Sequence, residues 1–219
     1  MKEFKAPENY KSAITTDRKI IFLAGSVEMG KAEPWQERIA NELKSTSLVL
    51  LNPRREDWDS SWSQTKDDPR FSEQVNWELD GIRDADVVAF YFDPNTASPI
   101  TLLELGSCIH RKKAVVCCPE GYFRKGNVDI VCDRYGIDQV GSLEELIEVL
   151  KSYDSDVKIK NEQPDITLVR SLCKEKFVLT GSMMEVILEY QKHRNIGTAE
   201  AYSQCAKWRE AYGWDSHRK

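Results

Sequence analysis

The sequence predicts an α/β protein, a doubly wound parallel sheet in three layers with a small helical appendage at the C-terminus. Four short apolar runs, each closed by turn-forming residues, are typical of strands buried on both faces of a sheet. Amphipathic segments with helical spacing separate these runs. Strands that alternate with helices form right-handed crossovers, which place helices on both faces of a parallel sheet.

The four predicted strands are followed directly by polar or turn-forming residues. Ligands of doubly wound sheets bind beyond the carboxyl ends of the strands, so these residues mark the candidate site. The runs and the residues that close them are Ile20–Ala24 before Gly25, Leu48–Leu51 before Asn52, Asp86–Phe92 before Asp93, and Ala114–Cys118 before Pro119.

The predicted helices lie between these strands and after the last one. Proline in the first turn favours a helix start at Pro34, and Ser142 with Glu145 forms a capping box. In the second helix the spacing of Val75, Leu79 and Ile82 predicts the buried face. The four helices are expected at Pro34–Leu43, Ser72–Arg83, Ile100–His110 and Ser142–Leu150.

Three regions are expected in the 219 residues: a flexible N-terminal arm at 1–17, a catalytic domain at 18–153, and a linker with a helical appendage at 154–219. In the appendage we expect helices at Ile166–Lys176, Ser182–Arg194 and Thr198–Tyr212. Its apolar and aromatic side chains predict docking or contacts in a homo-oligomer.

Composition excludes several classes of protein. The chain has 31 Lys and Arg against 36 Asp and Glu, a net charge of −5, and no long basic block, which argues against duplex nucleic acid as a partner. No apolar stretch approaches the roughly 20 residues that span a bilayer, so no membrane association is expected.

The six cysteines show no C-x-x-C spacing, and the N-terminus lacks the apolar core of a signal peptide. We therefore expect reduced thiols and a cytoplasmic protein. The three histidines, His110, His193 and His217, are too scattered to suggest zinc. Neither a metal nor a cofactor is predicted.

Gly25 and Ser26 follow the first strand without the spacing of a P-loop or of a dinucleotide fingerprint. A glycine there lets the backbone approach a ligand, while a plain tight turn is the alternative. After the second strand we expect Asn52, Arg54, Arg55, Trp58 and Trp62 to bind substrate. Arginines next to aromatic side chains suit an anion and a stacked base, with surface ion pairing as the alternative for the arginines.

Acidic residues gather before the third strand and after its end. Glu78 and Asp80 are about 200° apart on a helix, so at most one of them shares a tight site with a given partner. Glu104 follows Asp93 and Ser98, inside a mostly apolar helix that begins at a strand end. A carboxylate buried there needs compensation and has a raised pKa, whereas a lone helical glutamate usually faces solvent.

Three segments resemble the nucleoside 2-deoxyribosyltransferase superfamily, whose relatives include the 2'-deoxynucleoside 5'-monophosphate N-glycosidases. The resemblance covers about Lys19 to Leu150 and implies a flavodoxin-like fold and cleavage of the N-glycosidic bond of a nucleoside or nucleotide. The segments are Phe22–Ser26 (FLAGS), Trp77–Val88 (beginning WEL and ending ADVV) and Leu103–Gly106 (LELG).

The resemblance also implies roles for single residues. Glu104 matches the family nucleophile, which forms a covalent glycosyl-enzyme, and the second acid falls at Glu78, with Asp80 as the less favoured choice. A transition state with a developing cation at the sugar suits such a fixed carboxylate.

The sequence departs from the family at two positions. Ser98 replaces the aspartate of the transferases and resembles the serine that contacts the phosphate in the monophosphate glycosidases, which favours hydrolysis. Glu28 stands where those glycosidases carry a phosphate-binding arginine, so either Arg54 or Arg55 substitutes for it or the substrate lacks a phosphate. A nucleotide-sensing module without turnover and a glycohydrolase of a nicotinamide dinucleotide are the alternative functions.

Overall fold

The computed structural model describes residues 1–14, 18–27, 32–55, 57–59, 61–110, 114–154, 183–194, 201 and 205. Six parallel strands form one sheet in the order β1-β3-β2-β4-β5-β6. Helices cover both faces of this sheet, which confirms the predicted doubly wound, flavodoxin-like α/β fold. Within the described residues, no helix is long and apolar enough to cross a membrane.

The four predicted strands are all present, and the structure adds two more at the edges of the sheet. The predicted strands are β2 (Ile20–Gly25), β3 (Val49–Asn52), β4 (Val87–Tyr91) and β5 (Ala114–Cys117). The added strands are β1 (Lys2–Lys5) and β6 (Asp138–Val140), which are too short and polar to show an apolar run. Edge strands are often short and charged, because such strands resist pairing with other chains.

The prediction of a flexible N-terminal arm is wrong for the residues described there. β1 pairs in parallel with β3, and Phe4 and Tyr10 are buried. A short 3₁₀ helix, η1 (Lys11–Ala13), follows, and the Tyr10 hydroxyl donates a hydrogen bond to Asp84 over 3.1 Å. Two buried aromatic rings thus hold a segment whose other residues are mostly polar or exposed.

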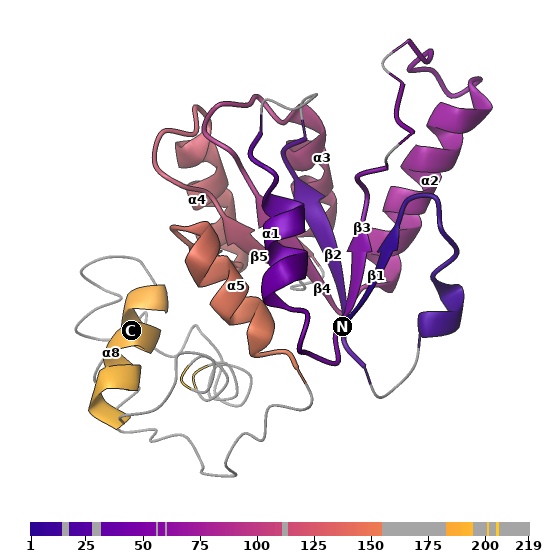
Figure 1. The fold of residues 1–219 in the computed structure, drawn as a ribbon. Coiled ribbons are helices and arrows are strands. Elements are labelled where there is room, and N and C mark those ends of the chain that lie inside the picture. Colours follow the sequence, from indigo (N-terminus) through magenta and orange to yellow (C-terminus); the bar gives the residue numbers. More distant parts are fainter. Residues whose placement is uncertain are drawn as a thin grey trace.

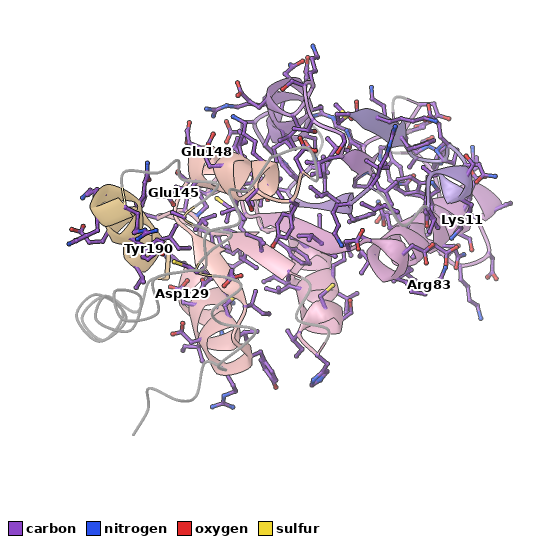
Figure 2. All side chains as sticks on the ribbon, turned by 90° about the horizontal axis from the view of Figure 1, so that it is seen from below. Lys11, Arg83, Asp129, Glu145, Glu148 and Tyr190 are labelled. Carbon is purple, nitrogen blue, oxygen red and sulfur yellow. The ribbon has the colours of Figure 1, made fainter. Side chains whose placement is uncertain are left out.

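The helices divide between the two faces of the sheet. α1 (Trp35–Glu42) and α5 (Leu143–Lys151) pack on one face, and Figure 1 shows them in front of the sheet. α2 (Pro69–Asp84), α3 (Pro99–Cys108) and α4 (Lys125–Tyr135), the last of which the sequence did not predict, pack on the other. Seen from below in Figure 2, Glu145 and Glu148 of α5 and Asp129 of α4 lie on opposite sides of the sheet.

Helix α8 (Met183–Arg194) corresponds to the middle of the three helices predicted in the appendage. Its residues Val186, Ile187 and Tyr190 are buried in the core on the α1 side of the sheet. The predicted helix at Ile166–Lys176, and the helix at Thr198–Tyr212 apart from residues 201 and 205, lie outside the described residues.

Helix α2 buries a different face from the one its aliphatic residues predicted. Leu79 is 54% exposed, whereas Gln74, Trp77, Gly81 and Ile82 are buried. A Cβ added at Gly81 would lie 2.7 Å from the ring of Phe22, so the absence of a side chain lets α2 pack closely on β2. This rotation turns Glu78 toward the sheet, because Glu78 lies one turn from both Gln74 and Ile82.

Candidate active site

Glu104 lies on α3, which follows the carboxyl end of β4. Its side chain is half-buried, between the buried positions Thr101 and Leu105 on one side and the exposed Leu103 on the other. Burial, and to a smaller extent the negative charge of Glu78, raise the pKa of Glu104 to about 8. The carboxyl groups of Glu78 on α2 and Glu104 on α3 therefore lie close enough to interact electrostatically.

Glu78 is the second member of this pair. It is also half-buried, and burial raises its pKa. The Gln74 amide opposes that rise, because its Nε2 donates a hydrogen bond of 2.9 Å to Glu78 Oε1 and favours the charged carboxylate. The same Nε2 donates to the carbonyl of Pro53 over 2.8 Å, so Gln74 holds Glu78 to the loop after β3.

Asp80 does not join this pair. Its side chain is 43% exposed and forms ion pairs with Arg83 at 2.6 Å and with Lys11 at 3.7 Å. The helical geometry that separates Glu78 from Asp80 thus places one of them at the site and the other on the surface.

Three buried hydroxyl groups gather where β2 and β4 end. The Oγ atoms of Ser26 and Ser98 are 2.5 Å apart, and Thr96 Oγ1 lies 2.8 Å from the first and 2.7 Å from the second. Ser26 Oγ also accepts a hydrogen bond of 2.9 Å from the backbone N–H of Asp93. These contacts join the first turn after β2 to the loop that leads into α3.

Ser98 has a φ of +46°, and it is the one non-glycine residue with a positive φ in the described part of the chain. A left-handed conformation at a residue other than glycine costs on the order of 1 kcal/mol or more and is often found at functional sites. Pro99 follows as the first residue of α3. The hydroxyl contacts of Ser98 and the fixed ring of Pro99 therefore set the direction in which α3 begins.

Gly25 and Asp93 support the backbone of the site. A Cβ at Gly25 would lie 2.5 Å from the carbonyl oxygen of Tyr91 and 2.7 Å from the ring of Trp35, so only glycine fits. The Asp93 carboxylate accepts hydrogen bonds from the backbone N–H groups of Glu33, at 2.9 Å, and Asn95, at 2.8 Å. Asp93 therefore holds the two loops that follow β2 and β4.

The loop after β3 carries the predicted aromatic and basic residues. Trp58 and Trp62 pack with their ring centroids 5.2 Å apart, and the guanidinium groups of Arg55 and Arg70 each lie 4.9 Å from the ring of Trp62. Arg55 is paired with Asp57 through contacts of 2.7 and 2.9 Å. Trp58 is 37% exposed, whereas Trp62 is buried, so of the two tryptophans only Trp58 leaves part of its ring open to a ligand.

Three other predicted residues lie away from the carboxyl pair or outside the described structure. Asn52 and Arg54 line a separate cavity on the α1 side of the sheet. Glu28 is outside the described residues. Within the described part of the chain, no three His, Cys, Asp or Glu side chains gather as a metal site would require.

Sequence reasoning missed Gln74 and Thr96. Gln74 stands four residues before Glu78, and this spacing on a helix is a signal for a side-chain hydrogen bond. Thr96 had no such signal, because its contact with Ser26 joins two loops that are 70 residues apart in the chain.

The fold and the carboxyl pair define the class, a doubly wound α/β protein with two interacting acids on adjacent helices at one face of the sheet. Residues 18–122 match a family described as nucleoside 2-deoxyribosyltransferase like. This match confirms the resemblance that the sequence motifs carry, and it supports glycosyl transfer or cleavage at a general level. No curated protein sequence matches the chain significantly.

Proposed function

We propose that this protein cleaves the N-glycosidic bond of a nucleoside or nucleotide, with Glu104 as the nucleophile and Glu78 as the acid. The observation that carries the proposal is the pair of half-buried, interacting carboxyl groups on α2 and α3. Two such groups with different environments suit one nucleophile and one proton donor.

In the first step a Glu104 oxygen bonds to the anomeric carbon as the bond from that carbon to the base nitrogen breaks. The electron pair of the broken bond stays on the base, which takes a proton from Glu78. The partly desolvated carboxylate stabilises the positive charge that develops on the sugar. The products of this step are the free base and a glycosyl ester on Glu104.

In the second step water attacks the anomeric carbon and the ester bond to Glu104 breaks. Glu78, now a carboxylate, takes a proton from the water, and both acids return to their starting states. A second nucleobase in place of the water gives transfer instead of hydrolysis. Ser98, at the position where the monophosphate glycosidases have serine, favours hydrolysis.

The reaction requires an ionised Glu104 and a proton on Glu78 or on the base. In the free protein a proton shared by the pair favours Glu104, because Gln74 stabilises the charge on Glu78 and the pKa of Glu104 is raised to about 8. The reactive form carries that proton on Glu78 or on the base. We therefore infer that binding of the base beside Glu78 draws the proton away from the nucleophile.

Exposed apolar side chains support the prediction of a homo-oligomer. They lie on and beside α2, α3 and α4, on the same side of the sheet as the carboxyl pair, where a second copy would exclude water from the site. These residues are Leu79, Ile100, Leu103, Phe123 and Ile130, each more than half exposed. Light scattering of the purified protein would reveal the oligomeric state, and a monomer at all concentrations would contradict the prediction.

The test of the proposed function is release of free base from a panel of nucleosides and nucleotides, followed by mass spectrometry. We expect release by the wild-type protein, none by Glu104→Gln, and a glycosyl adduct in the intact mass when turnover is slow. Asp80→Asn is the matched control, because Asp80 is a surface acid two residues from Glu78. Stabilisation by nucleotides without any base release would instead support a binding module.

A further inference from the structure

A cavity lies on the opposite face of the sheet from Glu78 and Glu104. It has a volume of about 560 Å³ and is lined by β1, α1 and the residues that follow β3. Its walls include Glu3 and Lys5, which alternate with the inward-facing Phe4 along β1. Figure 1 shows β1 at the edge of the sheet. Its residues Glu3 and Lys5 supply one wall of this cavity.

Gln36, from the first turn of α1, lines this cavity and is only 1% exposed. Neither its Nε2 nor its Oε1 has a hydrogen-bond partner within the described structure. A buried carboxamide without partners is costly, since it loses the hydrogen bonds that water would provide. Both atoms are closed to solvent, so a ligand reaches them only when the Gln36 side chain turns into the cavity that it lines. A molecule that offers a donor beside an acceptor, as an amide or a nucleobase edge does, would then satisfy both atoms.

The charges around the cavity favour an anion. Four basic side chains line it, Lys5, Lys44, Arg54 and Arg55, against two acidic ones, Glu3 and Glu37. Glu3 accepts a hydrogen bond of 2.8 Å from Asn52 Nδ2, so a neighbour partly satisfies its charge. Lys44 and Arg54 have no carboxylate partner among the described residues, which leaves two cations for a ligand.

We propose that this cavity is a second, non-catalytic binding site for a nucleoside monophosphate. Gln36 would pair with the edge of the base, and Arg54 and Lys44 would hold the phosphate. The volume lies within the usual range for small-molecule sites, about 300–1,000 Å³. The proposal does not depend on the proposed function, because α1, β1 and β3 build this cavity without Glu78 or Glu104.

Calorimetric titration with AMP tests the proposal. The titrations use Glu104→Gln protein, in which the proposed nucleophile is removed, so that turnover does not obscure binding. We expect saturable binding, and at least a tenfold loss of affinity when either Gln36→Leu or Arg54→Ala is added to that background. Asp80→Asn in the same background is the control and keeps the affinity. Adenosine and inorganic phosphate, titrated separately, each bind more weakly than AMP.

Three results would overturn the proposal. The first is no saturable binding of AMP at millimolar concentration, and the second is an AMP affinity that Gln36→Leu and Arg54→Ala leave unchanged from the Glu104→Gln background. The third is adenosine binding as tightly as AMP. Thermal melting checks that each variant is folded, and Gln36→Met, which keeps the length of the side chain, replaces Gln36→Leu if that variant unfolds. Failure here leaves base release by the wild-type protein unaffected. Absence of base release likewise leaves this binding test intact.

Discussion

The two faces of the sheet carry two different kinds of polar burial. On the α2 and α3 face, Glu78 and Glu104 are neighbouring acids whose pKa values are both raised, in each case chiefly by burial. On the α1 face, Gln36 is a neutral amide with no partner, and cations lie around it. The first arrangement suits proton transfer and attack on carbon, whereas the second suits recognition only. One sheet therefore presents two candidate sites of different chemistry.

The largest expected effect is a separation of base release, at the α2 and α3 face, from AMP binding, at the α1 face. Glu104→Gln should lower base release by at least about a thousandfold, because the nucleophile is lost, while binding of AMP at the α1 face persists. Arg54→Ala should do the reverse. Steady-state assays of base release and calorimetry of AMP binding, both carried out on both variants, measure these opposite effects. Equal loss of base release and of AMP binding in either variant would show that both properties depend on a single site.

The next effect concerns the pH dependence of the carboxyl pair. We expect kcat/KM of the wild-type protein to fall above about pH 8, because the pair then loses its last proton and no acid remains for the base. Glu78→Gln should slow base release about a hundredfold or more. It should also lower the pKa of Glu104, since the repelling charge is removed, and abolish the fall at high pH.

Rate profiles from pH 5 to 10, with Asp80→Asn as control, test this expectation. Asp80 pairs with Arg83 on the surface, so its variant should keep the wild-type profile. A Glu78→Gln profile with an unchanged alkaline fall would show that another group supplies the proton.

A smaller effect tests how the backbone positions Glu78. Gly81→Ala would bring a methyl group to 2.7 Å from the Phe22 ring, so α2 must move away from β2. We expect a loss of about 1–3 kcal/mol in the free energy of unfolding and a lower rate of base release. AMP binding should not change, because α1 and β1 stay in place. Urea unfolding and the two assays measure these effects, and an unchanged stability would contradict the close packing of α2.

The smallest effect concerns Gln36. Because its amide has no hydrogen-bond partner within the described structure, Gln36→Met should raise the free energy of unfolding by about 1 kcal/mol while it weakens AMP binding. Thermal melting with and without AMP gives both values. Loss of stability in this variant without AMP would show that the amide is not an unsatisfied group.

Local patterns in the chain were sufficient for the central sheet and for part of the site. The apolar runs of β2, β3, β4 and β5 predict buried strands, because a strand covered on both faces must be apolar throughout. The motif around Glu104 likewise points to a functional acid. The edge strand β1 escaped prediction, since only Phe4 of its four residues is buried.

The sequence by itself determined which residue types follow each strand, and hence that acids and hydroxyls would gather at the carboxyl edge of a parallel sheet. Only the tertiary structure placed Glu78, and not Asp80, beside Glu104, because Gly81 sets the rotation of α2 on β2. It alone also brought Gln36 and Arg54 to one cavity, since β1 and α1 meet there through contacts between distant parts of the chain. Periodicity describes one element at a time, whereas a site depends on how separate elements pack.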